Sequence, residues 1–281
     1  MSKWTLVFDG NRCNGCNACA LAVQDEYVGN RFPGFAEEMP RHGHRWIEVR
    51  RHERGQPPMV DVSYLVVMCQ HCEDPPCARA AHGGAVEKRP DGIVVIHPER
   101  SRGQKAIAEA CPYGAVWWNE EKQIPQHWNF DAHLIDQSWP VPRCVQVCPT
   151  GALTAMQLDD ARYEALRRDG AGDLRPELGS RPRVLYRNIE RFSRAFVGGT
   201  LVRQGAAGEE CAGGVPVKLF QGDELVGATS TDSFGDFKID GIPLRPEPLR
   251  LELRILADPP IQREIVLAES RYLGKIELGR L

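Results

Sequence analysis

The sequence lacks the features of membrane-spanning, secreted and nucleic-acid-binding proteins. No apolar run approaches the about 18 to 20 residues of a membrane-spanning helix. At the N-terminus, Lys3, Asp9 and Arg12 interrupt the apolar core that a signal peptide needs. The net charge is -3, and neither half of the chain has the basic excess that a binder of phosphate backbones requires. We expect a cytoplasmic protein with no membrane span of its own and no nucleic-acid partner.

The sequence also lacks any motif that would give it a substrate chemistry of its own. It contains no nucleophile elbow, no phosphate-binding loop and no pair of carboxylates at a catalytic spacing. We therefore expect a non-catalytic role.

The length of the chain predicts two folded domains. Its 281 residues exceed the about 250 at which single hydrophobic cores usually stop growing, and 42% of them are hydrophobic.

Cysteine is the informative residue. Nine of the ten cysteines lie within the first 148 residues, in tight groups. In a chain without a secretion signal, a reducing compartment disfavours disulfides, and clustered thiolates bind soft metals such as zinc or the iron of iron-sulfur clusters. We therefore expect the grouped cysteines to be metal ligands. Cys211 lies apart from them and is expected to be an ordinary buried thiol.

The spacing of the cysteines fits two cubane iron-sulfur clusters. A [4Fe-4S] cluster needs four thiolates, of which a Cys-x-x-Cys-x-x-Cys loop can supply three and a remote Cys-Pro the fourth. The proline stops the chain from continuing a helix through the site. The sequence offers two triplets and two Cys-Pro ligands: Cys13, Cys16 and Cys19; Cys69, Cys72 and Cys77; Cys111 and Cys148. Spacing alone does not decide which Cys-Pro joins which triplet.

Zinc is the alternative metal, because Cys69-x-x-Cys72 alone resembles half of a zinc site. Structural zinc sites use paired doublets of ligands, however, whereas this chain offers triplets and single Cys-Pro residues. Four histidines near the first two cysteine groups are not needed to fill either site, and we expect them not to be ligands: His42, His44, His71 and His82.

Short strands and helices frame these motifs. Strand-like stretches are expected at 4–8, 63–67 and 93–96, and a helix is expected to begin at 20–23. The segments CPYGA and CPTGA repeat one five-residue motif, and each precedes an apolar strand-like stretch, VWW or LTAM. This internal repeat predicts two duplicated cluster-binding units.

The remainder of the chain predicts a helix, a connecting segment and an all-β domain. The helix is expected to have Asp159 or Asp160 as its N-cap and to end at Gly170. Residues 171–183, rich in Gly, Pro and Arg, are expected to form a linker or an arm on a neighbour. Alternating strands with Gly, Pro and Asp turns predict an antiparallel sandwich: 215–220, 224–230, 234–239, 249–255, 263–268 and 274–279.

Together, these motifs resemble the ferredoxin-like iron-sulfur subunits of dimethyl-sulfoxide-reductase-type molybdopterin oxidoreductases. The likeness rests on CPYGA and PRCVQVCPTGAL. Further segments are most similar to the small subunits of pyrogallol-phloroglucinol transhydroxylase and resorcinol hydroxylase: GHRWIEVRRHERG, CQHCEDPPC, CPYGAVWWNEE, PELGSRPRVLYRN and TDSFGDFKID. The resemblance implies an α+β fold with a ferredoxin-like 4Fe-4S domain over 1–195. A small all-β transthyretin-like or prealbumin-like sandwich follows over 196–281 and is expected to serve docking or shielding.

The resemblance also implies which cysteines share a cluster. It pairs Cys13, Cys16 and Cys19 with Cys148, and Cys69, Cys72 and Cys77 with Cys111. A third family site would fall on Ala81, Ser101, Gln104 and Ile107, and is expected to be empty. A fourth would fall on Val23, Trp128, Asp131 and Cys144. Asp131 and Cys144 offer too few ligands for a third cluster, and the Trp128 ring can fill the space.

The implied function is electron transfer. The reaction would belong to a large catalytic partner that holds molybdenum on two pterins, outside this chain, and hydroxylates or transhydroxylates phenolic compounds. The electron acceptor is not identified by the sequence. The resemblance places the first site against this partner, where we expect the segment His44-Arg45-Trp46 to flank it.

Three other roles remain open. The chain could serve another molybdopterin reductase, acting on a sulfoxide, a polysulfide or an oxyanion. It could be a freely diffusing ferredoxin-like carrier, although such a carrier has no use for the β domain. It could also be a structural subunit whose clusters only stabilise the fold.

Overall fold

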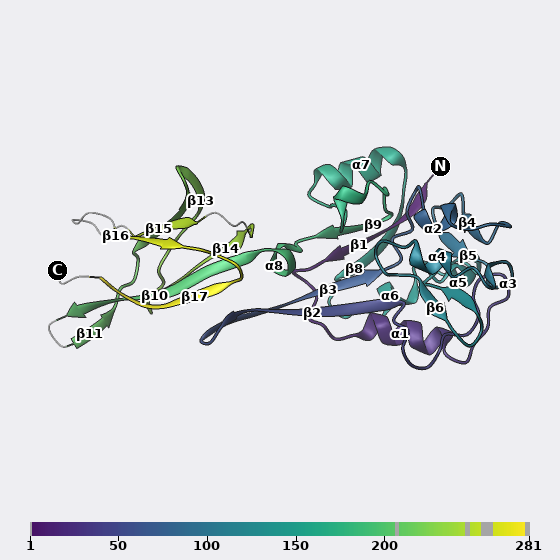
Figure 1. The fold of residues 1–281 in the computed structure, drawn as a ribbon, viewed down its shortest axis with the longest axis horizontal. Helices are drawn as coiled ribbons and strands as arrows, with labels where there is room; N and C mark the ends of the chain where they lie inside the picture. Colours follow the sequence, from purple (N-terminus) through teal and green to yellow (C-terminus); the bar gives the residue numbers. More distant parts are fainter. Residues whose placement is uncertain (1, 206–207, 245–247, 254–260, 279–281) are drawn as a thin grey trace. The chain divides into compact units, whose positions relative to one another are not determined.

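The computed structural model describes residues 2–205, 208–244, 248–253 and 261–278, which fall into two compact units (Figure 1). The first comprises Met1–Arg51 and Tyr64–Ile189, and the second comprises His52–Ser63 and Glu190–Leu281. No helix in the described part of the chain is both long and apolar enough to cross a membrane.

A three-stranded sheet carries the N-terminal strand of the first unit. Strand β1 (Lys3–Asp9) lies between β8 (Leu153–Leu158), which runs antiparallel to it, and β9 (Val184–Arg187), which runs parallel. The five central residues of β1 are all buried. Among them Thr5 is polar, and its hydroxyl accepts a hydrogen bond from the Arg183 guanidinium at 2.7 Å. The strand expected at 4–8 is confirmed.

The first unit contains the same arrangement of strands and helices around its cysteines two times, as the internal repeat predicted. Each cysteine triplet follows a strand, and its last cysteine lies in the first turn of the next helix: β1 and α1 (Ala18–Tyr27) for the first, β3 (Met59–Met68) and α2 (Pro76–Arg79) for the second. Each Cys-Pro follows a short helix and precedes a strand: α6 (Arg143–Gln146) and β8, then α4 (Ala106–Glu109) and β6 (Trp117–Asn119). Helix α1 packs against α6, and α2 packs against α4.

Short elements complete the first unit. They are β2 (Ile47–Gln56), which pairs with β3, β4 (Val86–Lys88), β5 (Val94–Ile96), α3 (Pro98–Ser101), β7 (Ile124–Gln126), α5 (Ala132–Asp136), α7 (Asp160–Arg168) and the 3-10 helix η1 (Pro176–Leu178). Strand β4 pairs with β5, and β6 pairs with β7. The end of the β2–β3 hairpin, residues 52–63, is grouped with the second unit.

Helix α7 has the predicted ends, but the segment after it is not a linker. The Asp159 carboxylate accepts a hydrogen bond from the amide of Arg162 at 2.8 Å, as an N-cap should, and Gly170 follows with a left-handed φ of 87°. Residues 171–183, expected to be a linker or an arm on a neighbour, lie within the first unit and pack on the second cysteine group. Leu174 and Leu178 supply the apolar contacts that hold the segment there.

Two four-stranded sheets make up most of the second unit. In one, β10 (Ala195–Gly205) pairs with β11 (Gly208–Cys211), β14 (Asp236–Ile242) and β17 (Arg271–Leu278). In the other, the order is β13 (Glu224–Ser230), β12 (Pro216–Gln221), β15 (Leu249–Leu253) and β16 (Ile261–Ile265). A short helix, α8 (Glu190–Ser193), precedes β10.

The two sheets share one hydrophobic core, as a sandwich requires, but β17 runs parallel to β10, so the expectation of a wholly antiparallel sandwich was wrong. Val197, Leu201 and Ile276 from the first sheet lie in one cluster with Leu219 and Leu251 from the second, and all five are fully buried. Parts of two predicted strands, residues 254–255 and residue 279, lie outside the described residues. The likeness to transthyretin-like sandwiches stays a prediction.

Candidate iron-sulfur sites

The pairing of β1 with β8 brings the first cysteine triplet next to Cys148. Strand β1 ends just before the triplet, β8 begins just after Cys148, and Phe8 pairs with Leu153 where the two strands meet these loops. The amide of Asp9 also donates to the carbonyl of Ala152 at 2.8 Å. Because the two strands are antiparallel, the end of β1 and the beginning of β8 lie next to each other, and so do the two cysteine-bearing loops.

One pocket collects the four cysteines of this first group. It is lined by Cys13, Cys16, Cys19 and Cys148, with apolar side chains that include Phe8, Val49, Val66 and Leu153. Cys19 is buried, whereas Cys16 is exposed. Four sulfur donors around a largely apolar pocket are the donor set that an iron-sulfur cluster requires.

The loop of the first triplet depends on a glycine. Gly15 has a left-handed φ of 72°, and a Cβ at this position would lie 2.3 Å from the ring of Tyr64. The neighbouring asparagines hold the loop through their side chains: Asn14 Oδ1 accepts from the amide of Cys16 at 3.2 Å, and Asn17 Nδ2 donates to the carbonyl of Gly15 at 2.9 Å. These bonds stabilise the turn that carries Cys13 and Cys16.

The thiols of the first group differ in their surroundings. Burial raises the pKa of Cys19 to about 12, and the neighbouring thiols add to this shift. Burial also raises the pKa of Cys148, but hydrogen bonds from the Leu153 amide, the Thr150 hydroxyl and the Ala152 amide hold it below its ordinary value. The Thr150 hydroxyl lies 3.8 Å from the sulfur. Donors of this kind stabilise a metal-bound thiolate as well.

The second triplet forms a more buried group with Cys111. Cys69, Cys72 and Cys77 are buried, and Cys111 is partly buried. Burial raises the pKa of Cys77 to about 12, and repulsion by the thiolates of Cys111 and Cys72 contributes in the same direction. Cys111 packs against the two small clusters that contain Cys77 and Cys72, so it lies with the second triplet. Thiolates in a group with three buried members need a compensating positive charge, which the iron of a cluster would supply.

Neither group is arranged for a single metal ion. Among the residues that the structure describes, no three His, Cys, Asp or Glu side chains converge closely enough to hold one ion. A cubane does not require such convergence, because each of its four irons binds a different thiolate.

The position of the fourth family site holds a closed hydrogen-bond network. Asp131 is fully buried and accepts bonds from the Trp128 indole at 3.1 Å and the Arg143 amide at 2.8 Å. The Tyr27 hydroxyl shares its single proton between Asp131 at 2.9 Å and Asn129 Oδ1 at 2.6 Å. Burial raises the pKa of Asp131, and these three donors oppose the shift. Cys144 directly follows Arg143, whose amide bonds to Asp131, and it is also fully buried.

Non-ligand side chains occupy the position of the third family site. Gln104 accepts a hydrogen bond from the amide of His82 at 3.0 Å and donates to the carbonyl of Arg100 at 2.7 Å. Ile107 is fully buried in a hydrophobic cluster against which Ala81 packs. These side chains are satisfied by protein contacts alone.

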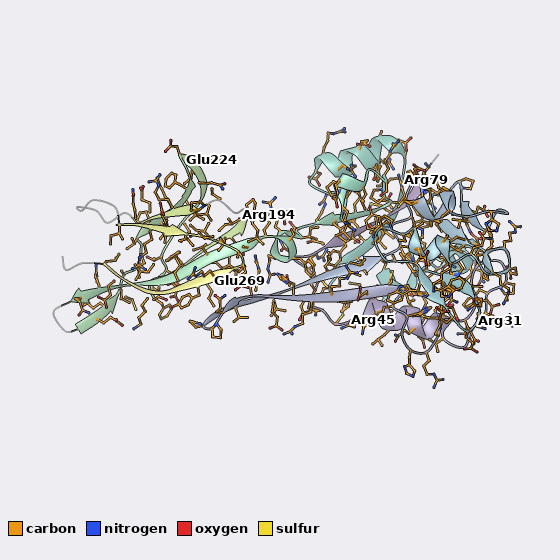
Figure 2. The ribbon with its side chains drawn as sticks, in the orientation of Figure 1. Arg31, Arg45, Arg79, Arg194, Glu224 and Glu269 are labelled. Carbon is orange, nitrogen blue, oxygen red and sulfur yellow. The ribbon has the colours of Figure 1, made fainter. Side chains whose placement is uncertain are left out.

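One expectation about a single residue was wrong: Cys211, expected to be buried, is exposed in β11. Trp46, expected to flank a partner interface, is only 1% exposed and packs on Tyr27 with ring centroids 4.8 Å apart, but it also lines the groove described next. Its indole faces inward just before β2 begins, and its place at an interface stays a prediction. Arg45 is exposed (Figure 2).

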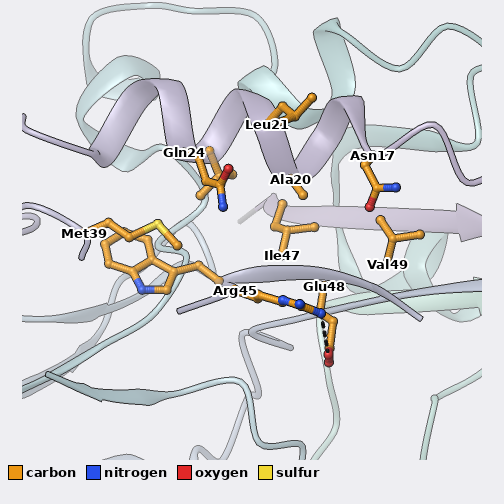
Figure 3. A pocket seen from close by; sticks show the side chains of 11 residues that line it. Asn17, Ala20, Leu21, Gln24, Met39, Arg45, Ile47, Glu48 and Val49 are labelled. Atoms are coloured by element: carbon orange, nitrogen blue, oxygen red, sulfur yellow. Dashed lines mark ion pairs between the residues drawn. The ribbon is translucent and has the colours of Figure 1, made fainter. Parts of the chain in front are cut away.

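A groove between α1 and β2 adjoins the first site (Figure 3). Asn17, Ala20, Leu21 and Gln24 line it from the side of α1, and Ile47, Glu48 and Val49 line it from β2. Asn17 and Val49 also line the cysteine pocket. Leu21 is 59% exposed, so an apolar surface lies immediately beside the first group.

Sequence reasoning missed the polar residues that support the second group. His71, between Cys69 and Cys72, is buried, and its Nδ1 accepts a hydrogen bond from the amide of Val94 at 3.0 Å. Tyr113, in the CPYGA motif, bonds to Ser180 at 2.8 Å. The CPYGA motif gave one indication of this contact, because it has the longer tyrosine where CPTGA has threonine.

Comparison with known proteins agrees with this geometry. Residues 60–158 match the family described as the 4Fe-4S dicluster domain. The chain is 37% identical over 246 residues to the pyrogallol hydroxytransferase small subunit of Pelobacter acidigallici, covering 86% of this chain and 88% of that protein. It is 30% identical to a sulfite dehydrogenase subunit of Allochromatium vinosum, covering 66% of this chain and 83% of that protein.

A third relative matches a smaller part of this chain. A subunit of the anaerobic dimethyl sulfoxide reductase of Escherichia coli (strain K12) is 32% identical, covering 57% of this chain and 77% of that protein. The cysteine groups, the dicluster match and these relatives lead to one assignment: this protein belongs to the iron-sulfur subunits of the dimethyl-sulfoxide-reductase-type molybdopterin oxidoreductases.

Proposed function

We propose that this protein binds two [4Fe-4S] clusters and transfers electrons for a large molybdopterin-containing catalytic subunit. The observation that supports this most directly is the presence of two separate cysteine quartets, each built from one triplet loop and one Cys-Pro. Cys13, Cys16, Cys19 and Cys148 would hold the first cluster, and Cys69, Cys72, Cys77 and Cys111 the second. When bound, the clusters supply one-electron redox chemistry.

The chain's own residues would set the conditions for that chemistry. The thiolates ligate iron, the apolar side chains around them exclude water, and nearby amides and hydroxyls donate to the sulfurs. All three influence the reduction potential of a cluster. The closed network around Asp131 leaves no free ligand set at the fourth family position, which supports two clusters rather than three.

We further propose that the partner hydroxylates or transhydroxylates phenolic compounds and holds molybdenum on two pterins. The support is the 37% identity to the pyrogallol hydroxytransferase small subunit, which extends over 86% of the chain. The electrons would pass to or from an acceptor that neither the fold nor the cysteine sites identify.

A second candidate is a subunit of a molybdopterin enzyme with a different substrate. The matches to the subunits of sulfite dehydrogenase and dimethyl sulfoxide reductase favour it. Activity of the purified complex towards pyrogallol or resorcinol would support the phenolic proposal. Activity only towards sulfite or dimethyl sulfoxide would replace it with the second candidate.

The decisive experiment counts iron and acid-labile sulfide in the purified chain and records electron paramagnetic resonance (EPR) during reductive titration. About eight irons per chain and two reducible signals are expected. About four or twelve irons would contradict the number of clusters. Eight irons with no reducible signal would favour the role in which clusters only stabilise the fold.

We also propose that the groove between α1 and β2 docks the large subunit, because it adjoins the first cysteine group and exposes Leu21. Arg45→Glu at its rim should slow electron transfer from substrate-reduced molybdenum without removing iron, as measured by rapid mixing. Arg162→Glu on α7 is the matched control, since its side chain is similarly exposed. Unchanged kinetics for Arg45→Glu in the intact complex would place the interface elsewhere.

A further inference from the structure

The side chain of Lys88 is attached to the middle of the second triplet loop. Lys88 is the last residue of β4, and its Nζ donates to the carbonyl of His71 at 2.9 Å and to the carbonyl of Gly92 at 2.7 Å. His71 lies between Cys69 and Cys72, the first two cysteines of this triplet. The side chain of Lys88 is only 20% exposed. A largely buried ammonium group therefore lies against the loop that carries the second group.

The same hairpin holds this loop through a second bond. His71 has a left-handed φ of 46°, which residues other than glycine rarely adopt. The amide of Val94 in β5, which pairs with Lys88 of β4, donates to His71 Nδ1 at 3.0 Å. The β4–β5 hairpin thus binds both the ring and the carbonyl of His71, so the positive charge of Lys88 has a fixed place beside the loop.

Positive charge is in excess at this place. Glu73 directly follows Cys72 in the sequence. Its carboxylate faces three cations: Lys3 Nζ at 2.6 Å, Lys88 Nζ at 3.6 Å and Arg183 Nε at 3.8 Å. Within the described ranges of the chain, none of the three has an ion pair with another carboxylate. Burial lowers the pKa of Lys88, and the Glu73 carboxylate opposes this shift.

The triplet loop of the first group is arranged differently. Among the residues with described positions, no lysine or arginine donates a hydrogen bond to the loop of residues 13–19, whose side-chain bonds come from Asn14 and Asn17. Arg12 precedes Cys13 but is exposed, so water and salt screen its charge. A buried charge beside one loop only should act on the two clusters unequally.

We propose that Lys88 raises the reduction potential of the second cluster, because its buried positive charge stabilises the reduced, more negative form. A cubane held by four thiolates carries a net negative charge, and reduction adds to it. A cation fixed close to the cluster therefore stabilises the reduced form more than the oxidised form. This inference rests on the proposed ligation of the second cluster by the second triplet and Cys111.

The test is an EPR-monitored redox titration of the full cluster-loaded chain at neutral pH. Lys88→Met, which removes the charge and keeps an unbranched side chain, should shift the midpoint potential of the second cluster to a more negative value and leave that of the first nearly unchanged. Lys88→Arg, which keeps the charge, should restore most of the wild-type potential. Glu73→Gln, which removes the opposing negative charge, should shift the second potential to a more positive value. The Cys148→Ala chain, which should lack the first cluster, assigns the two signals.

The direction of the shift separates an electrostatic role of Lys88 from a structural one. A loosened loop would admit water, which stabilises the more highly charged reduced form and raises the potential. Lys122→Met is the matched control, since Lys122 belongs to the same unit and is similarly exposed, at 24%, but pairs with Glu37 and Glu38. Its titration should match that of the wild type.

An unchanged or more positive second potential in Lys88→Met, or an equal shift of both clusters, would overturn the inference. If Lys88→Met loses iron, Glu73→Gln decides: full iron with an unchanged or more negative second potential overturns the inference too. Loss of the second cluster in both variants would assign Lys88 to holding the loop instead. A wild-type chain with only the first cluster would contradict the proposed function rather than this inference.

Discussion

At the residue scale, the cysteines carry most of the functional information because a cubane imposes strict demands on its ligands. The first triplet and Cys148 line one pocket, and Cys111 packs with Cys72 and Cys77 of the second triplet. Strand pairing gives the physical reason for the first grouping. Phe8 pairs with Leu153, so the loop after β1 and the loop before β8 lie at the same end of the sheet.

This grouping predicts that the two Cys-Pro cysteines serve different clusters. Cys111→Ala should remove the second cluster and Cys148→Ala the first, and each variant should retain about four irons. Iron analysis combined with EPR of the reduced chain measures both. If the two variants lose the same signal, the grouping is wrong.

Cys144 should not be a ligand. It is fully buried and directly follows Arg143, whose amide bonds to Asp131, and two further donors bond to that carboxylate. Cys144→Ala should therefore leave the iron count unchanged, with a stability cost that reflects only the lost packing of one sulfur atom. A loss of about four irons would show that a third cluster exists and that Asp131 helps to bind it.

At the element scale, most strands and helices could be predicted from local pattern, while contacts between distant residues could not. The apolar run at 4–8 and the cap at Asp159 are local signals, and both are confirmed. The bond between Tyr113 and Ser180 joins residues 67 positions apart, and no local sequence pattern predicts it. The burial of Trp46 was missed because its sequence neighbours are polar, whereas its ring packs on Tyr27 of α1.

The packing of Trp46 predicts a structural role for it. Trp46→Ala should lower the free energy of unfolding by about 3–5 kcal/mol, because truncating a buried indole leaves a cavity between β2 and α1. Urea unfolding of the cluster-loaded chain measures this loss. Trp118→Ala, at a half-buried position, is the control and should cost less. Equal costs for the two variants would argue against a core role for Trp46.

At the scale of the whole molecule, all eight proposed ligands lie in the first unit, whereas the second unit contains two sheets around a separate core. This division supports a docking or shielding role for the second unit. The residues that belong to the second unit could not be predicted from the sequence, because the unit includes residues 52–63 from the end of the β2–β3 hairpin. Arg54, 4% exposed, donates to Asp61 and to both carboxylate oxygens of Asp240, each at 2.7 Å.

Removing residues 196–281 should therefore preserve about eight irons and weaken association with the large subunit. Iron analysis and size-exclusion chromatography of the complex measure the two effects. Truncation also removes Asp240, one of the partners of Arg54. The full-length variant Arg54→Met controls for the loss of all the bonds that Arg54 makes, including the pair with Asp240. Normal association of the truncated chain would overturn the docking role.

The division of the β2–β3 hairpin has a consequence for synthesis on the ribosome. Arg54 and Asp240 are separated by 186 residues. At roughly 5–20 residues per second, the ribosome needs roughly 10–40 s to make the intervening chain. During that interval Arg54 has Asp61 beside it in sequence but not Asp240. We expect the second unit to be the last part of the nascent protein to close, at a time set by translation rather than by its own folding rate.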